Sequence, residues 1–304
     1  MRYRPLGNTG MAVSALQLVL ADSGGKRPSD WVQLVYTALE SGINSFEIAG
    51  RSAGLVDAFG EAIRAVDRNL VFIAWRLGWA TSNTGAAVRD FSAEGVARTI
   101  EAAIARTGIG YVDAAVLDDP PAGELSVQAM ETLKRLKDMG RVRMIGVSGS
   151  NDCTDAYISS RNFDLVSTSF SIISGWKERL RLKAAIDRDM AVVGHGYFPD
   201  AVLERQAASV VKSKLWSRQS NPLDGVGAYG FLSDTPSWTA EELCLAYAMT
   251  EPSLCSVQIA ADSISQVEAL GAVPDRELPP NVPAQIEMAR FSKPAQPEPV
   301  ARRA

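Results

Sequence analysis

Short apolar runs of strand length alternate with longer stretches in which apolar residues recur at helical spacing, from about residue 30 onward. This alternation is typical of repeated βα units around a parallel sheet. Eight units are reached when 15–20 is counted as the first strand, which predicts an α/β fold, a (β/α)8 TIM barrel. The predicted strands are 15–20, 43–49, 70–76, 111–117, 143–147, 164–168, 190–195 and 255–260, and the predicted helices are 31–40, 55–66, 93–107, 125–139, 151–160, 176–188 and 240–248.

Two segments fall outside this alternation. Residues 212–238 contain Trp216, Pro222 and several glycines without a clear period, which indicates a long loop between the seventh and eighth units. In a barrel, such a loop either shapes a ligand site or is a solvated insertion, and both readings stay open. The polar, proline-rich end of the chain favours a disordered tail at 286–304 after a barrel domain at 1–285.

Composition narrows the class of protein. With 304 residues and 46% apolar content, the chain can form one large core. The net charge of -4, with scattered Lys and Arg, argues against nucleic acid as a partner. The first residues include no apolar stretch long enough for a signal peptide or a membrane span, so we expect a cytoplasmic protein without a membrane partner. Three cysteines without metal-ligand spacing predict reduced thiols and no metal site.

Six segments follow one another in a recognisable order. The most specific is MGRVRMIGVS at 139–148, which is close to the motif GKVRAIGVS. The other five lie at 1–14, 41–49, 71–76, 111–120 and 255–270. On these segments the chain resembles the aldo-keto reductase family. The resemblance implies a barrel whose bottom is covered by an N-terminal β-hairpin, and a reaction in which a nicotinamide cofactor reduces a carbonyl.

The family's catalytic tetrad of Asp, Tyr, Lys and His falls on other residue types in this chain. Matched residue by residue, the four positions are Glu47, Ser52, Arg76 and Asp118. Glu47 and Arg76 preserve an acid–base pair, whereas the hydroxyl of Ser52 is far too weak an acid to replace a phenol. Losing a general acid typically costs about 10²- to 10⁴-fold in rate. Asp118 places negative charge where the family stabilises a polarised carbonyl oxygen.

Three residues near the predicted mouth have both a functional and a structural reading. His195 is the single histidine and ends the seventh strand, so it is a candidate for binding or proton transfer, although a structural imidazole is the commoner case. Trp75 and Trp79 flank Arg76, and packing in the core is the favoured reading of both.

The candidate cofactor-binding residues are incomplete by comparison with the family. The family binds the nicotinamide amide with a Ser-Asn pair and a Gln, and these positions hold Ser148, Gly149 and Ser167 in this chain. Tyr197 lies near the position of the family aromatic that stacks on the nicotinamide ring. At the adenosine end Asp262 replaces a Lys or Arg, and Gln266 lies in the same segment. An acid repels a 2′-phosphate and accepts from a free ribose hydroxyl. The resemblance therefore implies either no cofactor or NAD(P)H, with NADH favoured over NADPH.

Three readings of function follow. The first is a pseudoenzyme that binds a small molecule at the barrel mouth or an unspecified protein partner. The second is an NAD(P)H-dependent oxidoreductase that acts on a carbonyl with an altered acid/base set drawn from Glu47, Arg76, Asp118 and His195. The third is an ordinary reductase whose tetrad is misaligned, which predicts a tyrosine oxygen near the head group of Arg76.

Overall fold

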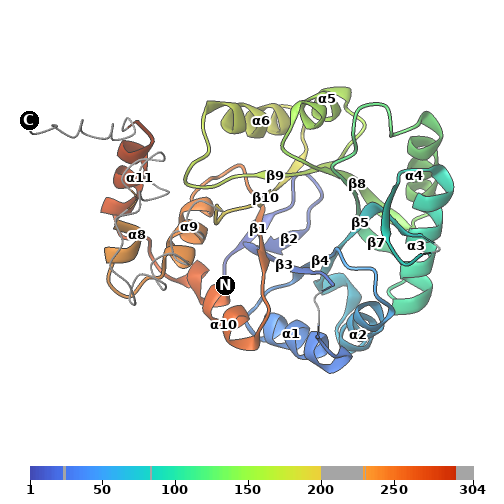
Figure 1. Ribbon diagram of the computed structural model, residues 1–304, viewed down its shortest axis with the longest axis horizontal. Helices are drawn as coiled ribbons and strands as arrows, with labels where there is room; N and C mark the ends of the chain where they lie inside the picture. The colour runs from blue at the N-terminus through green and yellow to red at the C-terminus, as the bar shows by residue number, and fades with distance from the viewer. Residues whose placement is uncertain (23–24, 83, 200–228, 230, 292–304) are drawn as a thin grey trace, which may run out of the picture.

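Eight parallel strands close into a barrel surrounded by helices, in a computed structural model that describes residues 1–22, 25–82, 84–199, 229 and 231–291 (Figure 1). The sheet order is β4-β3-β11-β10-β9-β8-β7-β5, and pairing of β4 with β5 closes the ring. The predicted (β/α)8 TIM barrel is therefore confirmed. The barrel strands are β3 (Leu16–Leu20), β4 (Ser45–Ile48), β5 (Phe72–Thr81), β7 (Val112–Asp118), β8 (Val142–Ser148), β9 (Leu165–Ser169), β10 (Ala191–His195) and β11 (Ser256–Ala260).

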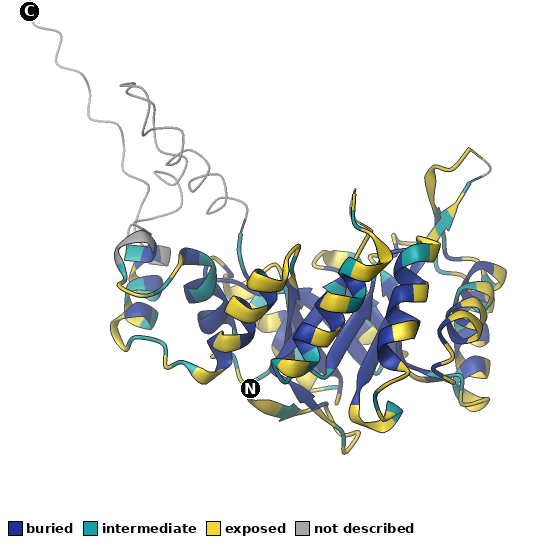
Figure 2. Cartoon of the chain, turned by 90° about the horizontal axis from the view of Figure 1, so that it is seen from below, coloured by how far each residue is buried: buried dark blue, intermediate teal, exposed yellow. Residues whose placement is uncertain are grey.

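The seven helices predicted from periodicity are all present, with boundaries shifted by a few residues. They are α1 (Pro28–Glu40), α2 (Ala53–Ile63), α3 (Ala93–Thr107), α4 (Val127–Asp138), α5 (Asp152–Ser160), α6 (Trp176–Ile186) and α9 (Ala240–Ala248). Side-chain oxygens of Ser92, Ser126 and Thr239 cap three of them at the N-terminus, which satisfies a free backbone amide in each case. Figure 2 shows buried strands at the centre and exposed outer faces on the helices.

Further elements were not predicted. They are α10 (Ile264–Ala272), α11 (Asn281–Phe291) and the short helices η1 (Arg68–Leu70), α8 (Phe231–Asp234) and η3 (Val273–Asp275). Helix α8 lies inside the expected loop 212–238, most of which falls outside the described residues. Helix α11 continues past residue 286, where the sequence suggested that a tail begins, and the remainder from 292 lies outside the described residues.

An N-terminal hairpin covers the bottom of the barrel. Strands β1 (Tyr3–Pro5) and β2 (Ala12–Ser14) pair in antiparallel register, from Tyr3 opposite Ser14 to Pro5 opposite Ala12. Leu6 and Val13 are buried in a cluster that the inward side chains of five barrel strands complete. The rest of that cluster consists of Phe72, Ala74, Ala114, Val116, Met144, Leu165, Ala191, Val193 and Cys255.

A second hairpin rises from the opposite end. Strand β5 continues beyond the barrel and pairs with β6 (Ala87–Asp90) in antiparallel register, from Gly78 opposite Asp90 to Thr81 opposite Ala87. The pattern of apolar residues did not predict β6, because its side chains are exposed or only half-buried. This hairpin brings Trp79 and Arg89 to the carboxyl end of the barrel.

Three further expectations concern the cysteines, a metal site and a membrane span. Cys244 and Cys255 are buried, Cys153 is half-buried, and none of the three forms a disulfide. Within the described ranges, no cluster of three or more His, Cys, Asp or Glu side chains could hold a metal ion. No described helix has both the length and the apolar character needed to cross a membrane.

Candidate functional site at the carboxyl end of the barrel

Alternation along the strands places the predicted site residues inside the barrel. Successive side chains of a strand point to opposite faces, so residues two apart share one face. On β5 the inward residues Phe72 and Ala74 belong to the lower core, and Arg76 comes next in the same direction. Asp118 on β7 follows Ala114 and Val116, and His195 on β10 follows Ala191 and Val193, in the same way.

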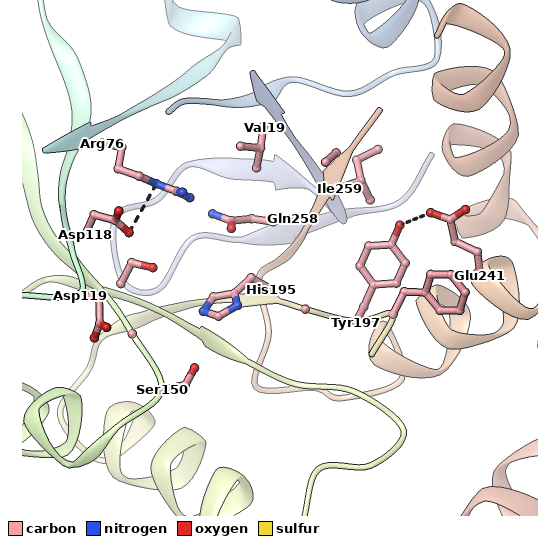
Figure 3. A pocket seen from close by; sticks show the side chains of 15 residues that line it. Val19, Arg76, Asp118, Asp119, Ser150, His195, Tyr197, Glu241, Gln258 and Ile259 are labelled. Atoms are coloured by element: carbon pink, nitrogen blue, oxygen red, sulfur yellow. Dashed lines mark hydrogen bonds and ion pairs between the residues drawn. The ribbon is translucent and has the colours of Figure 1, made fainter. Parts of the chain in front are cut away.

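A cavity of about 640 Å³ lies above this ring of side chains. Arg76, Asp118, His195 and Gln258 line its floor, and Tyr197 forms a wall on the other side (Figure 3). The remaining lining residues are Val19, Asp119, Ser148, Gly149, Ser150, Gly196, Phe198, Glu241, Ile259 and Ala260. The structure therefore brings together three of the five predicted catalytic residues at one opening, on the face where barrels of this type carry their active sites.

Glu47 and Arg76 form an ion pair in which the carboxylate is buried and the guanidinium is half-buried. Arg76 Nε donates to Glu47 Oε1 at 2.6 Å, and Nη2 contacts the same oxygen. Glu47 is only 1% exposed. Burial raises the pKa of the Glu47 carboxyl, and the adjacent guanidinium opposes that shift. Burial alone would lower the pKa of Arg76, but the carboxylates of Glu47 and Asp118 raise it, so the guanidinium stays charged.

Asp118 is held by the second hairpin more closely than by Arg76. Its Oδ2 accepts from Trp79 Nε1 at 2.6 Å and lies 3.7 Å from Arg89 Nη1. Its Oδ1 lies 4.0 Å from Arg76 Nε. The reading of Trp79 as a core residue is wrong, since its side chain is 36% exposed and orients Asp118, whereas Trp75 is buried as expected. Asp119, the residue after Asp118, is held separately, because its Oδ1 accepts from Asn151 Nδ2 at 2.7 Å.

Ser52 does not line the cavity. It is an exposed residue that precedes α2, and its Oγ accepts from the backbone amide of Leu55 at 3.3 Å. Its own backbone amide donates to Asp22 at 3.1 Å. The side chain therefore serves as a helix N-cap, a common role for Ser.

No tyrosine hydroxyl forms a hydrogen bond with Arg76, and all seven tyrosines of the chain lie within the described residues. Only Tyr197 lines the cavity, and its hydroxyl donates to Glu241 Oε1 at 2.8 Å. The misalignment reading predicted such a contact, so the structure argues against it. The other six are Tyr3, Tyr36, Tyr111, Tyr157, Tyr229 and Tyr247.

His195 presents an uncharged imidazole to the cavity. Burial lowers its pKa to about 4, and the positive charge of Arg76 adds to that shift. Neither ring nitrogen has a hydrogen-bond partner among the described residues. At neutral pH the ring therefore offers one N–H donor and one nitrogen acceptor to a bound molecule.

The candidate cofactor residues separate into two groups. Ser148 and Tyr197 line the cavity, whereas Ser167 lies beside Ser148 in the sheet register without lining it. The buried Oγ of Ser167 has no hydrogen-bond partner in the described part of the chain. Asp262 is exposed, and Lys26 Nζ contacts its Oδ1 at 2.6 Å. This ion pair offsets the negative charge of Asp262, which is the feature that favours NADH over NADPH.

The last candidate, Gln266, has a local role. Its Oε1 accepts from the backbone amide of Asp262 at 3.0 Å, next to the start of α10. It thereby fixes the loop between β11 and α10 and does not line the cavity.

A buried chain of side-chain amides beneath Arg76 was not predicted from the sequence. Gln258 Nε2 donates to Glu47 Oε2 and to Gln17 Oε1, the latter at 2.9 Å. Gln17 Nε2 in turn donates to Ser45 Oγ at 3.1 Å. Gln17 and Gln258 lie 241 positions apart in the sequence. The sequence carried one signal of this chain, a glutamine inside a strand otherwise made of apolar residues. Such a glutamine indicates a hydrogen-bond partner, because buried polar side chains are normally hydrogen-bonded.

Comparison with known proteins agrees with this architecture. The Aldo/keto reductase family matches residues 19–290, so the chain belongs to that family. The chain resembles an L-galactose dehydrogenase of Arabidopsis thaliana, with 31% identity over 160 residues that cover 49% of each protein, about half of that relative's length. An NADH-specific methylglyoxal reductase of Escherichia coli (strain K12) is 23% identical over 301 residues, which cover 88% of this chain and 91% of the relative.

A solved structure extends the likeness to the whole barrel. The holo form of an aldo-keto reductase from Bacillus halodurans aligns with a TM-score of 0.74 over 97% of this chain and 99% of that chain, at 21% identity. At this identity the likeness supports the fold alone.

Proposed function

We propose that this chain is a small-molecule-binding member of the aldo/keto reductase family that does not reduce carbonyls through a tyrosine acid. The placement of the seven tyrosines carries the proposal, because none of their hydroxyls forms a hydrogen bond with Arg76. An arginine cannot take the place of the phenol as an acid, because its guanidinium stays protonated in proteins. The cavity of about 640 Å³ and its polar floor support binding of a small molecule without that acid.

A nicotinamide nucleotide fits one half of this site. Ser148 and the ring of Tyr197 border the cavity, and the unpartnered hydroxyl of Ser167 lies next to Ser148. Ser148 and Tyr197 would hold the nicotinamide ring and its amide, and the bound nucleotide would supply a hydride. In the segment that matches the family's adenosine end, Asp262 is already paired with Lys26. We therefore propose NADH over NADPH chiefly because a relative that aligns with 88% of the chain is NADH-specific.

Nucleotide binding and turnover test the proposal separately. Purified protein is titrated with NADH and with NADPH, and its fluorescence is followed; binding of NADH without oxidation in the presence of methylglyoxal is the expected result. Oxidation that depends on methylglyoxal and disappears in both Arg76→Ala and Asp118→Ala would refute the binding-protein proposal. The two variants separate reaction at the cavity from contaminating reductase.

A second candidate function is an oxidoreductase with an altered acid/base set. It is favoured by the meeting of Arg76 and His195 in one cavity, where the guanidinium can polarise a carbonyl oxygen and the imidazole, once it is protonated as the pH falls toward 4, can donate that proton to the oxygen. In that case His195→Gln lowers turnover while NADH affinity stays within about twofold. A variant that keeps full turnover would rule out His195 as the proton-transfer group.

A further inference from the structure

The buried carboxylate of Glu47 holds two different polar groups, one on each oxygen. Oε1 accepts from Nε of Arg76 at 2.6 Å and also contacts Nη2 of the same residue. Oε2 accepts from the side-chain amide of Gln258. Arg76 comes from β5 and Gln258 from β11, on opposite sides of β4 and β3 in the closed sheet. One fixed anion therefore sets the orientation of both side chains on the cavity floor.

The charge of Glu47 determines which end of the Gln258 amide faces the cavity. An ionised carboxylate only accepts hydrogen bonds, so the amide nitrogen must face Glu47 and the amide oxygen must face away. The oxygen of Gln17, 2.9 Å from the same nitrogen, enforces the same orientation. Gln258 Oε1 accepts no hydrogen bond from the described residues, and the residue lines the cavity (Figure 3). It is an acceptor available to a ligand.

Arg76 provides the complementary donor. Nε and Nη2 are taken by Glu47, whereas Nη1 has no hydrogen-bond partner within the described part of the chain and is not fully buried. In Figure 3 the guanidinium of Arg76 and the amide of Gln258 point toward one another from opposite sides of the cavity floor. A donor and an acceptor therefore face the same space, each anchored from behind.

We infer that Arg76 and Gln258 form a paired donor and acceptor that selects ligands in which an oxygen acceptor lies next to an N–H or O–H donor. Carboxamides and hydroxycarbonyls share this chemistry. This inference rests on the proposed role of the cavity as a ligand site, and it adds Gln258 as a specificity residue and Gln17 as its positioning residue. A carboxylate ligand would place its second oxygen against Gln258 Oε1, and the two acceptors would repel each other. A plain ketone would leave Gln258 Oε1 without a hydrogen bond, which is unfavourable for a buried acceptor.

Three pyridines of nearly equal shape test the inference: nicotinamide, 3-acetylpyridine and nicotinate. We expect wild-type protein to bind nicotinamide about 10-fold more tightly than 3-acetylpyridine, the range of one buried hydrogen bond, and more tightly than nicotinate. In Gln258→Met, which keeps the length but removes the amide, nicotinamide and 3-acetylpyridine should bind within about twofold. Gln128→Met, on the exposed face of α4, is the matched control and should keep the wild-type preference. Affinities are measured by ligand-observed NMR titration.

Several results would overturn the inference. If the preference for nicotinamide persists in Gln258→Met and disappears in Ser148→Ala, the amide is held on the β8 side of the cavity. Failure of all three pyridines to bind at their highest soluble concentration also contradicts it. A titration with hydroxyacetone and 2-butanone distinguishes hydroxycarbonyls from carboxamides. Binding of the pyridines without binding of NADH would support the selectivity while the nucleotide proposal fails.

A direct readout of the anchor needs no ligand. The carbon-13 signal of the Glu47 carboxyl, assigned with Glu47→Gln, reports its pKa. Arg76, Asp118 and Gln258 are the polar groups that perturb this carboxyl. Removing the Gln258 donor should raise the pKa of Glu47 by about one unit or more, because hydrogen bonds to a charged group favour its charged form. An unchanged pKa in Gln258→Met, with the fold intact, would show that the anchor does not exist.

Discussion

At the scale of single residues, His195 predicts how stability depends on pH. Its folded pKa of about 4 lies below the usual histidine pKa of 6.5. The unfolded chain therefore binds the proton more readily, so the contribution of His195 is fully present above pH 6.5 and is lost as the pH falls toward 4. In His195→Gln this part of the acid-side loss should disappear. Urea midpoints at pH 7 and pH 5 check it, and an equal drop in both proteins would contradict the assignment.

Ser52 allows a test of its structural role. Its Oγ caps α2, so Ser52→Ala should lower the free energy of unfolding by about 1 kcal/mol. Ser52→Asp, which keeps an acceptor at the cap, should stay close to wild type. Urea unfolding curves measure both variants. If Ser52→Ala leaves stability unchanged but abolishes ligand binding, Ser52 belongs to the binding site and not to the helix cap.

Residue positions inside the barrel could be predicted from the sequence better than residue contacts. Counting in steps of two along each strand places Arg76, Asp118 and His195 at the mouth, and the structure agrees. The same counting could not show that Trp79 bonds Asp118, because that contact depends on how β5 pairs with β6. Nor could it pair Gln17 with Gln258, which meet only when the barrel closes.

At the scale of elements, Asp113 ties three strands and a short helix together below the site. Its Oδ2 accepts from Arg68 Nη2 at 2.6 Å and from the backbone amide of Ile73 at 2.9 Å, and Oδ1 accepts from Arg143 Nη1 at 3.2 Å. The two guanidinium groups also pack on the ring of Tyr111, at 4.0 and 3.9 Å from its centroid. One buried carboxylate thus links η1, β5, β7 and β8.

Removing that charge should be costly. Asp113→Asn keeps the shape but leaves Arg68 and Arg143 without a counter-ion, and breaking a buried pair in this way costs about 3 kcal/mol or more. Chemical denaturation provides the measurement, with Asp138→Asn on the exposed face of α4 as a control that should change little. A loss below about 1 kcal/mol would mean that solvent screens the pair, since the side chain of Arg143 is partly exposed.

Elements with a buried face could be predicted, and elements without one could not. The predicted helices each carry a stripe of apolar residues that packs on the barrel. In β6 no residue is fully buried, and its order comes from backbone pairing with β5. Exposed hairpins are therefore the part of this fold for which apolar periodicity carries least information.

At the scale of the whole molecule, the two ends of the barrel have separate roles. The N-terminal hairpin and the lower core close one end, and the ligand cavity lies at the other. In this fold the carboxyl end of the strands carries chemistry, and the amino end carries stability. Changes at the bottom should therefore alter stability without altering ligand affinity.

Leu6 tests this separation, because it lies between β1 and β2 and is 2% exposed in the lower core. Leu6→Ala should lower the free energy of unfolding by about 2–5 kcal/mol through lost burial and a residual cavity. Nicotinamide or NADH affinity of the folded variant should stay within about twofold of wild type. Leu70→Ala is the control at a leucine that is 64% exposed, and it should change neither quantity appreciably.

If Leu6→Ala weakens binding while the protein remains folded, the hairpin is coupled through the lumen to the cavity floor. The buried amides of Gln17 and Gln258 would then be the first connection to examine, because hydrogen bonds link them through Glu47 to Arg76.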